Sequence, residues 1–301
     1  MSDVYQEINR ALRTHYERTP YEMPSTGEFR RFLIGQETRN RKSALRGLHP
    51  WSGLFEFGLE WLSHTHIALN ETLKSEATQK RHTSQVAYAL TGSAVSFGLS
   101  LRSLCLLGFD TPARALLRSY VEIILLCLAA LHDEELARAY QQAQEDNDIK
   151  TFWHTTASPK NLHKRIVQIE EGMAFDAEAI KDLLDFRRQE YEILSQSSHI
   201  SYPAAWMTVF ASQIGFEEPL KPAIWGLATE NSQRTIFYAS FSTWYFSRLA
   251  YDRIIGWDQT GSLLVADKEN DWHRRIVMGR DVLGTVFMRH YPASHLTDST
   301  S

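Results

Sequence analysis

The strongest constraint in this sequence is a pair of apolar stretches that a short polar turn separates. Within residues 83–109 the only charged side chain is Arg102, and residues 115–131 are apolar on nearly every side of a helix. The turn between them begins with Asp110 and has Pro112 close behind, which predicts a helix start with Asp110 as its N-cap. A helix that is apolar all round must be surrounded by other helices or by lipid. The chain therefore contains a helical hairpin that other parts of the structure must cover.

A membrane-spanning hairpin is the alternative to one buried in protein. Residues 83–101 are nineteen uncharged positions in a row, close to the length that crosses a bilayer. However, nine of them are Thr, Ser, Gln or Gly, and no belt of Trp and Tyr with basic flanks brackets them. Small residues instead predict a seam for close approach of a neighbouring helix, formed by Ala89, Ser93, Ser96, Ser100 and Ser103. We therefore expect a hairpin covered by protein and no membrane partner.

The composition is that of an ordinary globular protein. Of the 301 residues, 43% are hydrophobic and 23% charged, so the chain can bury a core without disulfides or metals. A net charge of −4 argues against a generally basic surface that coats nucleic acid. Cys105 and Cys127 lie in apolar stretches, and the first residues show no signal-peptide pattern. A cytoplasmic location is therefore expected.

Helical periodicity extends over most of the remaining chain. Residues 51–74 carry apolar positions at close to 3.6-residue spacing, and Pro159 and Asp176 mark two further helix starts. Residues 229–255 predict a long aromatic helix that ends at Gly256, and no strand pattern is convincing. We expect an all-α fold, with a single antiparallel helical bundle over residues 50–291. A basic helical arm is predicted for residues 1–49 and a disordered tail for residues 292–301.

The charges on the apolar helix are the first candidate for a functional site. Arg118 and Glu122 lie one turn apart where apolar side chains are expected, and burying them unpaired would cost several kcal/mol. If the hairpin turn centres on Asp110, Arg102 lies opposite Arg118, which places Glu122 near two arginines. An arginine four residues before a glutamate stabilises an isolated helix less than the reverse order does. Helix stabilisation therefore explains this pair poorly. One other explanation is a buried Arg–Glu–Arg network that only fixes packing, and another is a polar site.

A second candidate lies on the helix that starts at Asp176. Its apolar seam changes to polar residues that share one face, namely Arg187, Arg188, Tyr191, Ser195 and His199. The last three are spaced by four residues and drift by only about 80° around the helix axis. Histidine exchanges protons near neutrality, and arginine binds phosphate or carboxylate groups. The pattern predicts an internal polar site, with a satisfied structural network as the alternative.

The two motifs resemble those of a family of uncharacterised bacterial all-α proteins. One helix of that family carries Arg-Ser-x-x-Glu, here Arg118, Ser119 and Glu122, and a later helix carries Tyr-x-x-x-Ser-x-x-x-His, here Tyr191, Ser195 and His199. The resemblance covers roughly residues 83–200. The family is similar in outline to the HEPN (higher eukaryotes and prokaryotes nucleotide-binding) helical bundles, many of which serve bacterial defence or toxin systems.

The chain departs from the ribonuclease members of that group. Those proteins carry arginine and histidine separated by four to six residues, whereas ten residues lie between Arg188 and His199 here. The resemblance therefore implies a nucleotide-related ligand without implying ribonuclease activity, and whether the chain is an enzyme stays open.

These observations lead to one functional hypothesis with two alternatives. The hypothesis is an internal site for a nucleotide or nucleic-acid end. Its anion-binding residues are expected to be Arg118, Arg187, Arg188, Ser195 and Arg102, and its proton-exchanging or orienting residues His199, Tyr191 and Glu122. The first alternative is a non-enzymatic interaction or regulatory protein, with a protein partner or a second copy of the chain.

The second alternative is a metal-dependent oxidase. Glu56, Glu60 and His64 repeat at four-residue spacing, which would aim three metal ligands in one direction. However, their face lies opposite the apolar seam of the same helix, so a solvated surface is expected. A di-iron bundle also needs a Glu-x-x-His pair on each of two helices, which the sequence lacks. We therefore expect no metal and no cofactor.

Overall fold

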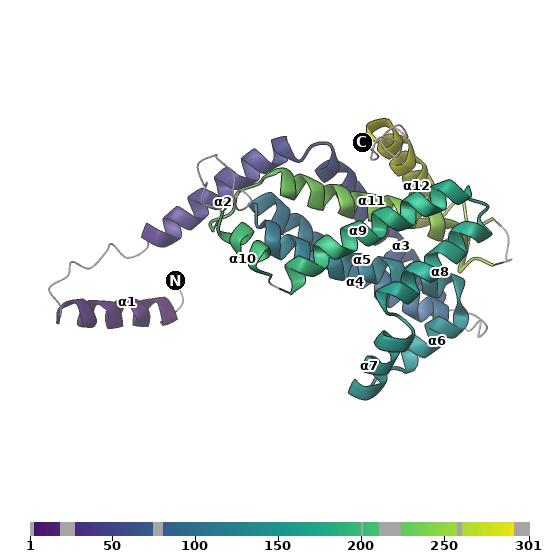
Figure 1. Cartoon of the computed structure of the whole chain (residues 1–301), viewed down its shortest axis with the longest axis horizontal. Coiled ribbons are helices and arrows are strands. Elements are labelled where there is room, and N and C mark those ends of the chain that lie inside the picture. The colour runs from purple at the N-terminus through teal and green to yellow at the C-terminus, as the bar shows by residue number, and fades with distance from the viewer. Residues whose placement is uncertain are drawn as a thin grey trace.

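The computed structural model describes residues 3–18, 28–74, 81–199, 201–210, 224–257 and 261–291 (Figure 1). Over these residues the regular structure is helical apart from two strands of two residues each, which confirms the all-α prediction. The helices are α1 (Asp3–Tyr16), α2 (Glu28–Gly47), α3 (Trp51–Lys74), α4 (Arg81–Leu107), α5 (Asp110–His132), α6 (Glu134–Gln142), α7 (Asp146–Thr155), α8 (Pro159–Gly172), α9 (Ala177–Ser198), α10 (Tyr202–Val209), α11 (Glu230–Ile254) and α12 (Asp271–His290). The strands β1 (Ile255–Gly256) and β2 (Leu264–Val265) pair in parallel.

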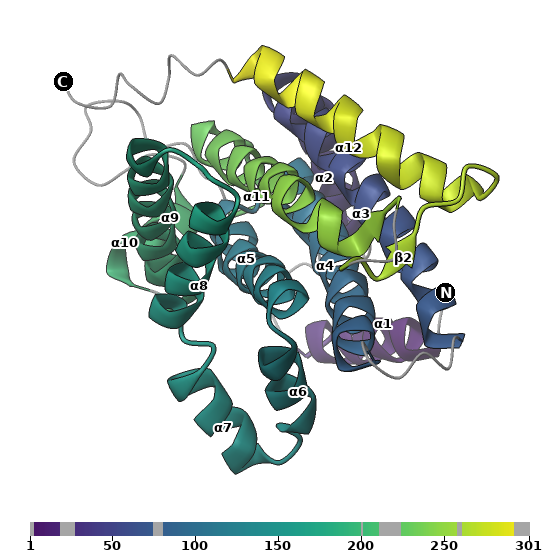
Figure 2. The ribbon, with the colours of Figure 1, turned by 90° about the vertical axis from the view of Figure 1, so that its right-hand side faces the viewer.

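The predicted hairpin is present as α4 and α5, and α5 lies at the centre of the structure. The turn between them contains Gly108, whose φ of +75° favours glycine. A Cβ at this position would lie 2.4 Å from the backbone of Leu227, so the glycine also permits close packing of the turn. Figure 2 shows α5 between α4, α8, α9 and α11, all of which contact it.

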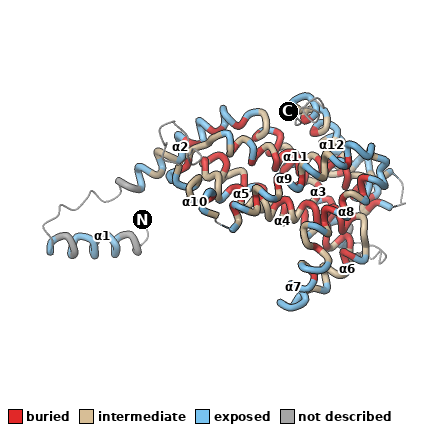
Figure 3. Tube along the Cα trace, viewed as in Figure 1, coloured by how far each residue is buried: buried red, intermediate tan, exposed pale blue. Residues whose placement is uncertain are grey.

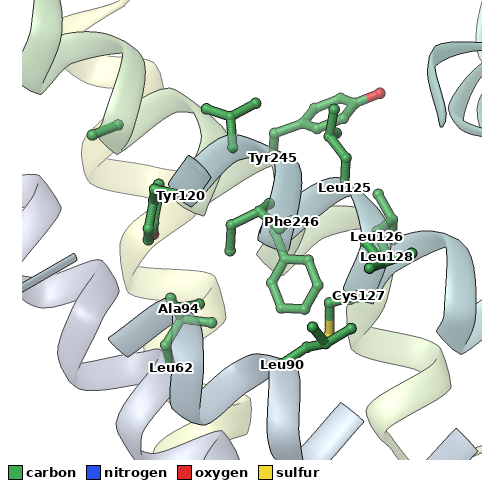
Figure 4. Packing of buried hydrophobic residues seen from close by; sticks show 14 of the residues in the cluster. Leu62, Leu90, Ala94, Tyr120, Leu125, Leu126, Cys127, Leu128, Tyr245 and Phe246 are labelled. Carbon is green, nitrogen blue, oxygen red and sulfur yellow. The ribbon is translucent and has the colours of Figure 1, made fainter. Parts of the chain in front are cut away.

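Apolar side chains from several helices bury α5. Figure 4 shows Leu62 of α3, Leu90 of α4, Leu125 of α5 and Phe246 of α11 meeting in one cluster. Each of these side chains is at most 5% exposed, and burying one contributes roughly 1.5–3 kcal/mol. Buried segments run through the middle of the molecule, whereas α1 and α7 are mostly exposed (Figure 3). The core is thus built around the segment that the sequence identified as most apolar.

Two helices, residues 82–107 and 110–132, are long and apolar enough to cross a membrane by length and composition. In α5, 61% of the most apolar window is buried inside the protein, as in the core helix of a globular protein. The corresponding share of α4 is 39%, because one of its faces is open. Ala89, Ser96 and Ser100 are exposed on this face, so the expected covering of the small-residue seam is wrong for the described part of the chain.

The N-terminal region has two different parts. Helix α1 lies apart from the other helices in Figure 1, and its apolar residues Ile8 and Leu12 are exposed. Helix α2, by contrast, packs on α4, and the buried side-chain amide of Asn40 donates to the carbonyl oxygens of Leu107 and Gly226. The second half of α2 is therefore attached to the hairpin turn.

Asp110 has a different role from the predicted one. It lies inside the first turn of α5, where Phe109 is the N-cap residue and no side chain caps the helix. Instead, the Asp110 carboxylate accepts hydrogen bonds from the hydroxyl groups of Thr229, at 2.6 Å, and of Ser232. Because Thr229 and Ser232 form the capping box of α11, Asp110 attaches the start of α11 to the start of α5.

Replacing Asp110 should therefore weaken the α5–α11 contact. We expect Asp110→Ala to lower the free energy of unfolding by about 1–3 kcal/mol, because the buried hydroxyl of Ser232 and the partly buried hydroxyl of Thr229 lose their acceptor. Burial raises the pKa of the Asp110 carboxyl, so Asp110→Asn, which keeps one acceptor oxygen without charge, should cost less. Urea unfolding measures both values. Equal and negligible losses would show that Asp110 does not hold α11 in place.

Candidate functional site

The two motif helices lie side by side, and their polar residues meet at Arg118. The guanidinium Nε donates to the Glu122 carboxylate at 3.1 Å, and Nη2 donates to the Tyr191 hydroxyl at 2.7 Å. The Tyr191 hydroxyl in turn donates to the same oxygen of Glu122 at 2.9 Å. One edge of the guanidinium is therefore held in a closed triangle between α5 and α9. The expected contact between the two motifs is confirmed.

The other side of the same guanidinium has looser contacts. Its Nη1 donates to Ser195 Oγ at 3.3 Å and lies 3.4 Å from Nε2 of His199. These distances are near the upper limit for hydrogen bonds. His199 is exposed and forms the C-cap of α9, so its imidazole lies where the cluster opens to solvent.

The Arg118 cluster is half-buried. The side chains of Arg118 and Glu122 are 23% and 25% exposed, so water reaches both, which differs from the predicted internal network. Burial lowers the pKa of Arg118, but the Glu122 hydrogen bond and the neighbouring Tyr191 outweigh it and raise the pKa above its ordinary value. Burial and the Glu122 carboxylate raise the pKa of Tyr191 to about 12. At neutral pH the site therefore holds a guanidinium and a protonated tyrosine.

Arg187 does not reach this cluster. It is 1% exposed and forms a bidentate ion pair with Glu170 of α8, at 2.6 and 3.1 Å, and a hydrogen bond of 2.9 Å to the Tyr245 hydroxyl of α11. Expecting Arg187 beside Arg118 was wrong, because this side chain turns toward α8 and α11. The neighbouring Arg188 is exposed on α9, with no resolved contact to Arg118.

Arg102 also lies elsewhere. Its Nε donates to the Glu56 carboxylate of α3 at 2.7 Å. Helix α4 packs against both α3 and α5, and Arg102 is on the side that faces α3. The predicted position of Glu122 between two arginines is therefore wrong, since its resolved arginine contact is with Arg118.

The four-residue repeat on α3 does not form a metal site among the described residues. Glu56 is paired with Arg102, and Glu60 lies 3.8 Å from His64. Among the residues that the structure describes, no group of three His, Cys, Asp or Glu side chains could hold a metal ion. The side chain of His64 is only 14% exposed, so the expectation of a solvated surface holds for Glu60 but is wrong for His64.

His163 of α8 is a residue of the site that the sequence did not indicate. It is buried, and its ring packs edge-to-face on Tyr191 with 6.0 Å between ring centroids. Burial, followed by the charges of Arg187 and Arg188, lowers the pKa of His163 to about 4. The imidazole is thus neutral and forms an apolar wall behind Tyr191. A single histidine in an amphipathic helix gives no motif that could have revealed this contact.

Comparison of the chain with protein-family descriptions, curated proteins and solved structures gave no match. The resemblance to uncharacterised bacterial all-α proteins therefore rests on the residues of the two motifs alone. What the site can bind follows from its own geometry.

The two Arg–Glu pairs should differ in their contribution to stability. Glu170 is fully buried, so Glu170→Ala leaves the Arg187 charge uncompensated and should lower the free energy of unfolding by about 3–5 kcal/mol. Glu122 is partly exposed, so Glu122→Ala should cost only about 1 kcal/mol. Chemical denaturation of both variants measures the difference. Equal losses would contradict the assignment of a sealed and an open pair.

The lowered pKa of His163 predicts a pH dependence. Below pH 6.5 the unfolded chain binds a proton at this histidine, whereas the folded protein does so only near pH 4. The contribution of His163 to the free energy of unfolding is thus complete above pH 6.5. It decreases as the pH falls, by on the order of 3 kcal/mol at pH 4. His163→Gln should flatten this part of the curve measured by urea unfolding. Parallel curves for the two proteins would show that His163 is not desolvated.

Proposed function

We propose that the Arg118 cluster binds an anionic ligand that carries a phosphate group, such as a nucleotide or a nucleic-acid end. The observation that carries this proposal is the unequal engagement of the guanidinium. Glu122 and Tyr191 fix the Nε and Nη2 edge, whereas Nη1 has two long contacts on the side where the cluster is exposed to solvent. The contacts of Nε and Nη2 set the plane of the guanidinium, and Nη1 is the nitrogen that can donate to a ligand.

The chemistry of the open side favours a phosphate. In the contacts described, Nη1 is paired with the Ser195 hydroxyl and the His199 imidazole and with no carboxylate, and phosphate oxygens form shorter and stronger charge-assisted hydrogen bonds with a guanidinium. The Ser195 hydroxyl and a protonated imidazole of His199 can donate to the same anion. A ligand would thus replace two weak contacts by several strong ones.

Each polar residue has a stated role in this proposal. Arg118, Ser195 and His199 bind the anion, and His199 is the group that can exchange a proton with it or with water. Glu122 and Tyr191 orient Arg118, and the raised pKa of Tyr191 keeps its hydroxyl protonated as a donor. Arg188 is exposed on α9 and can attract an anion from solvent. The proposal requires only that these residues bind the anion. Catalysis would require, in addition, that His199 exchanges a proton.

The setting that we propose is a cytoplasmic protein related in outline to HEPN-like bundles of bacterial defence systems. Cys105 and Cys127 are buried thiols in apolar stretches of α4 and α5, and this cysteine usage, without a disulfide framework among the described residues, is the basis for proposing a reducing compartment. The two motifs of the resemblance supply the residues that meet at Arg118. Both features support the proposal.

A second candidate function is that of a non-enzymatic interaction protein. It is favoured by α1, an amphipathic helix that lies apart from the other helices with Ile8 and Leu12 exposed at 48% and 39%. Such a face is typical of a helix that docks on a partner protein or on a second copy of the chain. In this case the Arg118 cluster would only attach α9 to α5.

The phosphate dependence of binding distinguishes the two functions. We expect the protein to bind AMP or a 5′-phosphorylated oligonucleotide, and to bind adenosine or the 5′-hydroxyl oligonucleotide at least tenfold more weakly. Ser195→Ala and His199→Ala should each weaken phosphate binding about tenfold, or about 1.4 kcal/mol, with nearly unchanged thermal midpoints. Isothermal titration calorimetry measures the affinities.

Lys181→Ala, an exposed charge removal near the start of α9, is the matched control and should bind like the parent protein. Binding that does not depend on the phosphate, or that both site variants retain in full, would contradict the proposed site. A complete lack of binding would favour the interaction protein.

A further inference from the structure

A groove separate from the Arg118 cluster lies between α3 and α12. These helices are on the far side of α5 and α11 from α8 and α9 (Figure 2). The groove has a volume of about 410 Å³, within the range of roughly 300–1,000 Å³ typical of small-molecule sites. Its apolar lining residues are Phe57, Trp61, Met278 and Val282.

The base of the groove is fixed by Trp61, and a glycine lets α12 pack closely on it. The Trp61 indole is 1% exposed, and its Nε1 donates to the carbonyl oxygen of Ile276 at 2.9 Å. A Cβ on Gly279 would lie 2.9 Å from Cδ1 of this indole, closer than real Cβ contacts. Gly279 therefore lets the backbone of α12 lie directly against the indole, and Phe57, Met278 and Val282 remain as the apolar side chains that a ligand can reach. Met278 and Val282 lie one turn apart on α12, are 65% and 46% exposed, and both line the groove.

One end of the groove carries an arginine without a carboxylate partner. Asp271 and Arg274 line this end and form an ion pair with each other. The Arg275 guanidinium lies 5.8 Å from the centroid of the Trp272 ring and forms no ion pair with any described carboxylate. It is therefore available to an external anion.

His64 and Glu60 complete the polar end and limit the charge of a ligand. Burial lowers the pKa of His64, so its imidazole is neutral at pH 7 and can form a hydrogen bond without adding charge. The Glu60 carboxylate is exposed at the same end and repels a second negative charge. A singly charged carboxylate suits this end better than a phosphate dianion.

We propose that the α3–α12 groove binds a small amphipathic molecule with a hydrocarbon body and one carboxylate. The body would lie against Phe57, Met278 and Val282, and the carboxylate would pair with the planar guanidinium of Arg275. This site takes no part in the phosphate site at Arg118, so the two proposals can fail independently.

Titration with decanoate, decanol and decyl phosphate tests the proposal. We expect decanoate to bind at least tenfold more tightly than the other two compounds, as measured by isothermal titration calorimetry. Arg275→Gln should weaken decanoate binding about tenfold and leave decanol binding unchanged. Arg274→Gln is the matched control, because Arg274 already pairs with Asp271, and it should bind decanoate like the parent protein.

A second variant tests the location. Val282→Trp adds bulk at an exposed position that tolerates it, and should abolish binding of decanoate while the thermal midpoint is retained. The proposal is overturned if the parent protein does not bind decanoate, if decyl phosphate or decanol binds as tightly, if Arg275→Gln and Arg274→Gln behave alike, or if Val282→Trp binds normally.

Discussion

The burial of α5 on every side is the constraint on which the other helices depend. Thirteen of its residues are buried, and α4, α8, α9 and α11 all contact it. Two charged residues on such a helix can be accommodated only where a neighbour supplies polar partners and access to water. Helix α9 meets both requirements for Arg118 and Glu122, through Tyr191 and the open end near His199. The position of the candidate site is thus a consequence of how the core is packed.

Much of this arrangement could be predicted from the sequence, and the predictions that were wrong have identifiable physical reasons. The α4–α5 hairpin follows from hydrophobicity, and the meeting of the two motifs follows from polar residues on faces that should be apolar. The partners of Arg102 and Arg187 could not be predicted, because a small rotation of a helix changes which neighbour a side chain faces. Glu56, which pairs with Arg102, and Glu170, which pairs with Arg187, belong to neither motif. His163 has no pattern of its own.

The two Arg–carboxylate clusters beside α9 illustrate how burial separates structure from function. Arg187 and Glu170 are closed on all sides, with Tyr245 as an additional partner, so they fix the positions of α8, α9 and α11. Arg118 has similar partners but keeps about a quarter of its side chain exposed. The same chemistry therefore stabilises the fold at one position and remains accessible to a ligand at the other. At α3 and α12 the missing side chain of Gly279 instead lets the two helices pack closely at Trp61.

The central claim is that Arg118 has one fixed edge and one that is free to bind a ligand. Double-mutant cycles without ligand measure this directly, with Arg118→Ala combined with Tyr191→Phe in one cycle and with Ser195→Ala in the other. The account predicts a coupling free energy of about 1 kcal/mol or more for Arg118 with Tyr191, and only a few tenths for Arg118 with Ser195. Equal couplings in the two cycles would show that both sides of the guanidinium are structural, and would contradict the account.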